Sequence, residues 1–241
     1  ENRQWELHQF RSRYHREEVT NNRGGWAKLE FSKTEHLTSE GYFTYLKEFK
    51  GGHSLNAVAG YSYFEKNGEN FNAENYDFGV EGLKYWDLES GSYLTDGKAK
   101  MGSKKDITER LFALYARANY SYNDKYMVTA TIRHEGSSKF AAENRWGNFW
   151  ALSGGWRVSG EEFMKEFDWV NDLKIRFGYG VTGNNDFDAS YMANTLSRDQ
   201  YWMLPSGSWA FVYGPSSNVN PYLGWEEKKE WNIGVDYSFF G

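Results

Sequence analysis

Residues 112–133 read FALYARANYSYNDKYMVTATIR, and they decide the fold. From Phe112 to Tyr122 the even positions hold apolar or small side chains, whereas polar side chains gather on the odd positions near the end. From Tyr126 to Ile132 the even positions are again apolar, and polar residues appear between them. Successive side chains of a strand point to opposite faces of a sheet. The pattern therefore predicts two strands, each apolar on one face, joined by a tight turn over 123–125.

The same alternation recurs along the chain. It is clear over 173–181 and 231–239, and weaker over 27–31, 43–49, 55–63 and 150–158. These stretches make about eight strands, each near the roughly 9–11 residues that a tilted strand needs to cross a bilayer. Aromatic residues cluster toward the strand ends, as in the interfacial girdles of membrane barrels. We therefore expect an all-β, antiparallel segment of a transmembrane β-barrel.

The connections alternate in length as well. Residues 50–52 and 123–125 are tight turns, whereas 65–110 and 183–226 are long, polar and rich in Gly, Asn and Ser. A third short connection, 159–171, contains Glu161-Glu162-Phe163-Met164-Lys165, which could form one helical turn. Short turns on one side and long loops on the other are typical of outer-membrane barrels. We expect short periplasmic turns and long extracellular loops.

Composition excludes several classes of protein. The formal net charge is −5, so no basic field indicates a nucleic-acid partner or an anionic membrane surface. The absence of cysteine excludes disulfides, thiolate metal sites and a cysteine nucleophile. The longest apolar run, Leu111 to Ala116, is far below the length of a transmembrane helix.

A soluble β-sandwich would also bury one apolar face of each strand. The opposite face distinguishes the two architectures, because a sandwich or a small barrel fills its interior with bulk. Here that face carries Gly, Ser, Thr and Asn together with basic residues, namely Arg117, Arg133, Arg157, Lys174 and Arg176. This pattern favours a wide polar lumen. A soluble or surface-attached β-sandwich that binds glycans remains the alternative.

Several motifs follow one another in a recognisable order. Residues 117–133 carry R-x-N-Y-x-Y and then K-Y-x-x-x-A-x-x-R. Further motifs are GSSKF (136–140), NRWGNF (144–149), GWR (155–157), EEF (161–163), LKIRFGYGVTGN (173–184), NPYLGWE (220–226) and WNIGVD (231–236). In this order they resemble the SusC/RagA family of TonB-dependent outer-membrane transporters, strongly over about 110–241 and loosely over 43–63. Glu135 and Lys139 replace the Asp and Arg that the family pattern usually shows, with charge preserved.

This resemblance implies a fold, a location and a function. The barrel would have about 22 strands and a plugged lumen. Residues 1–241 would form part of that barrel domain, with the plug domain, the TonB box and the C-terminal strands absent from this sequence. The chain would lie in the bacterial outer membrane as a multi-pass β-barrel in contact with lipid. It would take part in active import of oligomeric nutrients, glycans or peptides.

The resemblance also implies partners. A SusD-like surface lipoprotein would act as the lid, and the TonB–ExbB–ExbD complex would supply energy through the plug. Neither a cofactor nor a nucleic-acid partner is implied. An outer-membrane enzyme would need a nucleophile and a base, and the sequence nominates neither. We therefore expect no catalytic residues and no enzyme activity.

Two groups of residues are candidates for substrate binding. Residues 201–213 form an aromatic stretch without any charge, and rings are good platforms for sugar faces and apolar side chains. The candidates there are Tyr201, Trp202, Trp209 and Tyr213. The loop could instead pack on itself or contact a partner protein. The second group comprises the arginines Arg133, Arg157 and Arg176, which we expect to line the lumen.

Metal binding has weak support in the sequence. Asn184, Asn185, Asp186 and Asp188 supply oxygens at a spacing that could hold Ca²⁺, but the sequence favours a solvated loop after the TGN turn. The five histidines form no H-x-x-x-H or H-E-x-x-H motif. We therefore expect no metal site.

Overall fold

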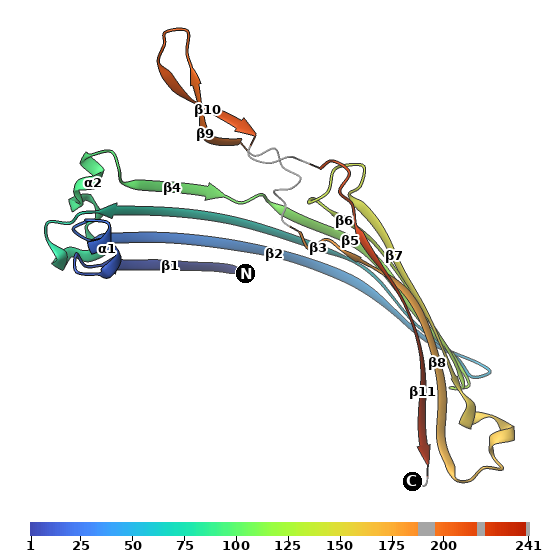
Figure 1. The fold of residues 1–241 in the computed structure, drawn as a ribbon. Coiled ribbons are helices and arrows are strands. Elements are labelled where there is room, and N and C mark those ends of the chain that lie inside the picture. The colour runs from blue at the N-terminus through green and yellow to red at the C-terminus, as the bar shows by residue number, and fades with distance from the viewer. Residues whose placement is uncertain (188–195, 216–219, 240–241) are drawn as a thin grey trace. The chain divides into compact units, whose positions relative to one another are not determined.

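The structure, a computed structural model, describes residues 1–187, 196–215 and 220–239. The elements in chain order are β1 (Asn2–Arg11), α1 (Arg16–Thr20), β2 (Trp26–Phe49), β3 (His53–Tyr76), η1 (Glu81–Trp86), η2 (Leu88–Ser90), α2 (Ser92–Thr95), β4 (Lys100–Lys105), β5 (Glu109–Tyr122), β6 (Tyr126–Ser137), β7 (Trp146–Arg157), η3 (Val158–Gly160), η4 (Glu162–Met164), β8 (Val170–Asn184), β9 (Leu196–Met203), β10 (Trp209–Pro215) and β11 (Glu226–Phe239) (Figure 1). No helix in these described ranges is long and apolar enough to span a membrane.

The strands pair in an order that follows the sequence. The main sheet runs β1-β2-β3-β5-β6-β7-β8-β11, with β4 beside β3, and β9 pairs with β10 in a separate hairpin. The chain divides into two compact units. Unit 1 comprises Glu1–Leu37 and Glu65–Thr108, and unit 2 comprises Thr38–Phe64 and Glu109–Gly241. Strands β2 and β3 contribute to both units.

In unit 2 the strand register joins apolar side chains into continuous rows. One row pairs Tyr122 with Tyr126, Tyr126 with Trp156, Trp156 with Ile175, and Ile175 with Val235. Neighbouring rows add further exposed apolar residues on the same parity, including Tyr120, Val128, Ile132, Trp150, Leu152, Phe177, Trp231, Ile233 and Tyr237. We call this surface the apolar belt. The predicted alternation is therefore confirmed, and its apolar face has no protein cover within the described residues.

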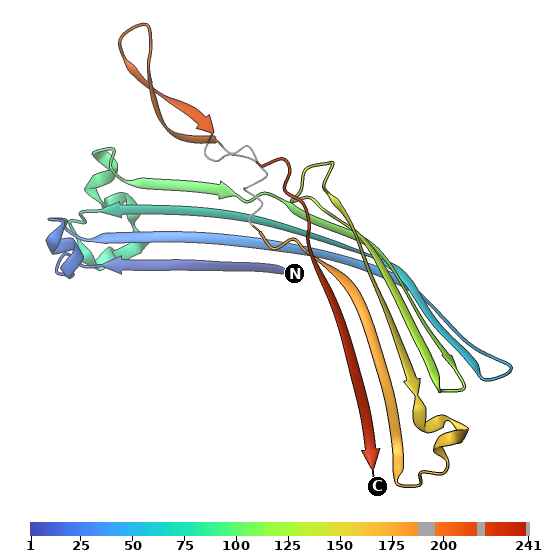
Figure 2. The same cartoon turned by 45° about the vertical axis from the view of Figure 1, so that its right-hand side comes forward.

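The antiparallel strands of unit 2 run side by side over most of their length (Figure 2). Their extent differs from the sequence prediction in several places. The stretches 27–31 and 43–49 belong to one strand, the 24-residue β2, and β3 is equally long. The expected loop 65–110 therefore begins as strand and also contains β4. In contrast, Val158 lies outside β7, at the start of η3.

Strands β1 and β4 were not predicted because neither shows an apolar alternation. Their sequences, NRQWELHQFR and KMGSKK, are mostly polar, with only Trp5, Leu7, Phe10 and Met101 as large apolar residues, and both strands lie in unit 1. Backbone pairing alone extends the sheet there, from Asn2 opposite Glu35 to Arg11 opposite Trp26. The expected loop 183–226 likewise contains regular structure, the hairpin β9–β10.

Unit 1 is held by a buried ion pair. The Glu18 carboxylate is fully buried, 2.8 Å from Arg23 Nε and 3.7 Å from Arg11 Nη1. The two guanidinium groups lie over the rings of Tyr76 and Trp26, at 4.5 and 4.4 Å. Charge pairing and cation–π contact together compensate for the desolvation of these groups. The connection between β1 and β2, which contains α1, is therefore packed through Arg23 against Tyr76 at the end of β3.

At the turn end of unit 2 the short connections are tied together. The Asn123 amide donates to the Gly52 carbonyl at 2.7 Å, which joins two neighbouring turns. The Glu161 carboxylate accepts hydrogen bonds from Tyr126 Oη (2.6 Å) and Trp156 Nε1 (3.0 Å). With Lys125 Nζ at 3.3 Å, these donors lower the pKa of Glu161 below its ordinary value. The first Glu of the EEF motif thus has a structural role.

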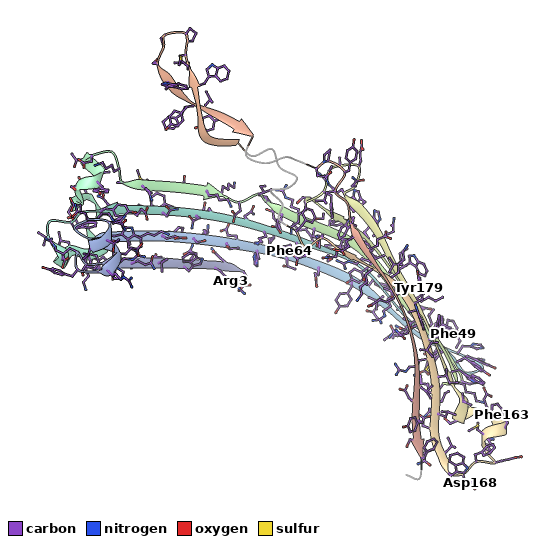
Figure 3. All side chains as sticks on the ribbon, viewed as in Figure 1. Arg3, Phe49, Phe64, Phe163, Asp168 and Tyr179 are labelled. Carbon is purple, nitrogen blue, oxygen red and sulfur yellow. The ribbon has the colours of Figure 1, made fainter. Side chains whose placement is uncertain are left out.

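The expected helical turn near Glu161 is present, as two short 3₁₀ segments, η3 and η4. The cap of η4 is at Glu161, and Phe163 within it is exposed. Figure 3 shows Phe163 and Asp168 in this connection, at the opposite end of the strands from the hairpin between β6 and β7.

At the loop end of unit 2, motif residues converge in an aromatic hub formed by Phe140, Phe149, Phe187 and Trp225. The ring centres of Phe140 and Phe149 lie 5.0 and 5.1 Å from that of Trp225, and Phe187 lies 5.1 Å from Phe140. Trp225 Nε1 donates to the Arg145 carbonyl at 3.0 Å. The motifs GSSKF, NRWGNF and NPYLGWE therefore meet in one packed cluster.

Two glycines make room for the hub. A Cβ atom at Gly147 or Gly183 would lie 2.4 or 2.1 Å from the ring of Phe149, whose exposed fraction is only 7%. Because that ring is packed, it cannot move aside easily. The hub therefore anchors both ends of the loop between β8 and β11 to the β6–β7 hairpin.

The belt assignment predicts a difference between adjacent residues of β11. Ile233→Arg places a charge on the apolar belt and should lower the free energy of unfolding by about 2–4 kcal/mol in a bilayer. Asn232→Arg, one residue earlier on the opposite face, should have little effect because that face is polar. Unfolding of the full-length protein in vesicles measures both. Equal losses would contradict the assignment of faces.

The hub predicts a second difference, within β7. Gly147→Ala should cost about 1–3 kcal/mol of stability because its methyl group overpacks the Phe149 ring. Gly154→Ala is the matched control, since the nearest atom to its Cβ would be 3.9 Å away. Thermal unfolding of the two variants gives the comparison. If Gly147→Ala unfolds at the same temperature as Gly154→Ala, the hub is loosely packed and the prediction is wrong.

Candidate functional site

The face opposite the apolar belt is polar and is called here the polar wall. One of its rows pairs Asn119 with Thr129, Thr129 with Ser153, Ser153 with Gly178, and Gly178 with Asn232. The next row toward the turn end joins Ser121, Met127, Gly155, Arg176 and Gly234 in the same way. Small and uncharged side chains thus form most of this surface.

The three candidate arginines lie on the polar wall, and each is paired with a carboxylate. Arg133 binds Glu135 through two hydrogen bonds, of 2.7 and 2.9 Å, and its Nη2 also lies 3.4 Å from Ser62 Oγ. Arg157 pairs with Asp172 at 2.8 Å, and Arg176 pairs with Asp236 at 2.7 Å. The two hydrogen bonds between Arg133 and Glu135 fix the plane of the Arg133 guanidinium group. The wall therefore presents oriented ion pairs rather than free charges.

The arginines do not form one cluster. Lys174 is opposite both Arg157 and Asp236 in the register, and Arg176 is two residues further along β8, so these basic residues gather near the turn end. Arg133 is opposite Phe149, close to the aromatic hub at the loop end. A substrate group bound by Arg157 or Arg176 at the turn end would therefore not also contact Arg133 at the loop end.

A concave pocket of about 410 Å³ opens on the polar wall near the turn end. Its polar lining includes Asn56, Asn119, Ser153, Lys174 and Asn232, along with Arg176. Amide and hydroxyl groups of this kind can donate and accept hydrogen bonds with a polar solute. Apart from Arg176, these residues were not among the candidate site residues. The sequence shows only that each of these residues lies on the polar face of its own strand. The strand register is needed to show that they are neighbours.

The candidate aromatic residues lie in the hairpin of β9 and β10. Tyr201, Trp202, Trp209 and Tyr213 are all exposed, at 58 to 66%. The register sets Phe211 opposite Tyr201 and Trp209 opposite Met203, so these four side chains share one face. The rings of Tyr201 and Phe211 are 4.4 Å apart. Trp202, opposite Ala210, lies on the other face.

The hairpin therefore places Trp202 and Trp209, two candidates from one aromatic stretch, on opposite faces. Trp202 and Trp209 cannot stack on the same ligand from one side of the ribbon, because they point to opposite faces. Phe211, which was not a candidate, belongs with Trp209 and Tyr201. We call the surface of Tyr201, Met203, Trp209 and Phe211 the aromatic face of the hairpin.

The possible calcium ligands are engaged with neighbouring groups. Asn184 donates to Glu226 at 3.0 Å and accepts from the Asp186 amide, and Asn185 donates to Ser137. Asp188 lies outside the described residues. No cluster of three or more His, Asp or Glu side chains suited to a metal ion occurs in the part of the chain that the structure describes.

Comparison with known proteins gives the same fold. A family model described as "TonB dependent receptor-like, beta-barrel" matches residues 1–241. The TonB-dependent receptor P39 of Formosa agariphila is 35% identical over 212 residues, covering 84% of this chain and 18% of that protein. The TonB-dependent receptor SusC of Bacteroides thetaiotaomicron is 33% identical over 146 residues, covering 60% of this chain and 15% of SusC.

A solved structure agrees at the level of fold. A chain of the RagAB peptide importer in its "closed-closed" state superimposes with a TM-score of 0.70 at 23% identity, covering 90% of this chain and 22% of that one. The present chain thus spans less than a quarter of each of these proteins. The matched family comprises outer-membrane β-barrels. The chain therefore belongs to the TonB-dependent receptor-like β-barrel family, as a SusC/RagA-like segment of an outer-membrane barrel.

Proposed function

We propose that this chain forms part of the wall of a transporter that actively imports oligomeric nutrients across the bacterial outer membrane. Residues 1–241 would contribute a run of strands to one large barrel domain of about 22 strands. The apolar belt would face lipid and the polar wall would face the lumen. The family consists of transporters and receptors, and we propose that the chain catalyses no reaction itself.

The observation that carries the proposal is the polar wall. Its rows of Asn, Thr, Ser and Gly, with arginines held in ion pairs, are typical of a lumen that admits water and polar solutes. A small closed barrel would fill this space with bulky side chains. A soluble β-sandwich would need a second sheet over the apolar belt, and in the described residues its side chains remain exposed.

Two kinds of partner follow from the proposal. Relatives named as TonB-dependent receptors support coupling to the TonB–ExbB–ExbD complex, which would act through the plug. The SusC/RagA-like motifs support a SusD-like surface lipoprotein at the extracellular mouth. A solved neighbour is named as a peptide importer, so we retain peptides beside glycans as the cargo class.

We further propose that the aromatic face of the hairpin contacts cargo. Its rings are exposed and carry no charge, which suits stacking on sugar faces or apolar side chains. Tyr213, two residues beyond Phe211 on β10, adds a further exposed ring. The arginines Arg133, Arg157 and Arg176 would then meet polar groups of the cargo inside the lumen.

The test is uptake by cells. A strain that lacks the full-length protein should lose growth on one class of oligomer, glycan or peptide, and keep growth on the corresponding monomers. Complementation should restore uptake, and a proton uncoupler should abolish it. Unchanged growth on every oligomer, or uptake that survives the uncoupler, would contradict the proposal.

Hairpin variants test the cargo contact. Trp209→Ala with Phe211→Ala should weaken the apparent affinity of uptake about fivefold for each ring, because stacking contributes about 1 kcal/mol per ring. Trp202→Ala, on the other face, is the matched control and should change uptake little. If the double variant instead loses the lipoprotein during purification, the aromatic face is a protein interface.

A further inference from the structure

The apolar belt is interrupted by a groove across β2, β3, β5 and β6. The groove has a volume of about 350 Å³. Five alanines from β3, β5 and β6, among them Ala118 and Ala130, form its floor, while Phe43, Tyr45 and Ile132 stand at its sides. Elsewhere the belt carries larger exposed side chains of Trp, Tyr, Leu and Ile. The groove is therefore a local hollow in a surface that faces the bilayer.

Cross-strand contacts show that these residues share the belt face. A Cβ atom at Gly41 of β2 would lie 2.7 Å from the ring of Tyr61 of β3, so the odd positions of both strands point the same way. The ring of His53 stacks on that of Tyr122, a belt residue, at 4.6 Å. The odd positions of β2 and β3 thus lie on the same side as the belt.

The turn end of the same strands carries basic and hydroxyl groups. Lys47 is on the belt parity of β2, and its Nζ lies 5.2 Å from the ring centre of Phe49, toward the turn. Lys50 follows in the turn and is exposed. Neither lysine has a carboxylate partner within the described ranges. A long lysine side chain can carry its charge out of the apolar region in this way.

His53 adds a polarised hydrogen-bond donor beside the lysines. Its Nδ1 lies 2.7 Å from the hydroxyl oxygen of Tyr120. When Tyr120 donates to Nδ1, the histidine carries its proton on Nε2, which can donate to an anion. Lysine ammonium and imidazole donors together suit the oxygens of a phosphate group.

We propose that the alanine-floored groove and the adjoining Lys47, Lys50 and His53 form a binding site for one phospholipid of the inner leaflet. An acyl chain would lie in the groove, and the headgroup phosphate would meet the basic cluster. The turn end faces the periplasm in barrels of this kind, which selects the inner leaflet as the source. The proposal rests on the membrane location of the belt and not on the import function.

The choice of occupant follows from the continuity of the two features. An apolar groove alone would accept any acyl chain or membrane helix. Here Lys47 lies two residues beyond Tyr45, a groove residue, on the same face of β2 and toward the turn end. The site therefore combines an apolar part for an acyl chain with a cationic part for the anionic phosphate of a phospholipid. Each methylene group placed in the groove adds to the affinity.

The experiment measures lipid retained by the purified full-length protein. The protein is stripped of lipid in detergent and titrated with phosphatidylglycerol, and native mass spectrometry counts the bound molecules. One tightly held lipid per barrel is expected. Ala118→Phe, which fills the groove floor, should lower its affinity roughly tenfold, the change expected when about two methylene groups lose their contacts. Lys47→Gln with His53→Gln should also weaken binding.

Two control variants lie outside the site. Leu152→Phe adds bulk to the belt on β7, and Lys229→Gln removes a cation near the loop end of β11. Both should retain the lipid as the unchanged protein does. Heat-dependent mobility in gels shows whether Ala118→Phe folds. If it does not, the test of the proposal is the phospholipid affinity of the Lys47→Gln, His53→Gln double variant. Equal retention in site and control variants, or a co-purified lipopolysaccharide or protein in place of phospholipid, would overturn the proposal.

Discussion

The structure of unit 2 depends on one constraint, the two-residue alternation of side chains across strands whose register is locked by backbone hydrogen bonds. The pairing of Tyr122, Tyr126, Trp156, Ile175 and Val235 sets a whole row on one face. A slip by one residue would move that row to the opposite face. It would then bring Arg176 into lipid and rings into the lumen. The chemistry of both surfaces therefore follows from the register.

The strand ends are fixed by different chemistry. At the turn end, Glu161 accepts hydrogen bonds from Tyr126 and Trp156, which ties the β7–β8 connection to the neighbouring strands. At the loop end, Trp225 packs on Phe140 and Phe149 and holds the loop that carries the hairpin. Several family-like motifs thus have structural roles, whereas the residues proposed to meet cargo lie in the polar wall and in the β9–β10 hairpin.

The sequence predicted the strands with a clear apolar alternation, such as 173–181 and 231–239, because burial in lipid imposes a two-residue period. It did not predict β1 or β4, because their few apolar side chains do not alternate over enough residues to give a period. The sequence placed Arg133, Arg157 and Arg176 on the polar face but not the pocket, because Asn119, Ser153 and Asn232 become neighbours only through pairing of distant strands. For the same reason the separation of Trp202 from Trp209 required the register of the hairpin.

The most direct test of the account is a scan of β11 by spin labelling. Single cysteines are placed in turn from Trp231 to Tyr237 in a cysteine-free variant of the full-length protein in bilayers. These 241 residues contain no cysteine and need no background substitution. Labels at 231, 233, 235 and 237 should collide readily with oxygen dissolved in lipid and be shielded from a water-soluble nickel chelate. Labels at 232, 234 and 236 should show lower oxygen accessibility. A profile without a two-residue period, or with the opposite phase, would contradict it.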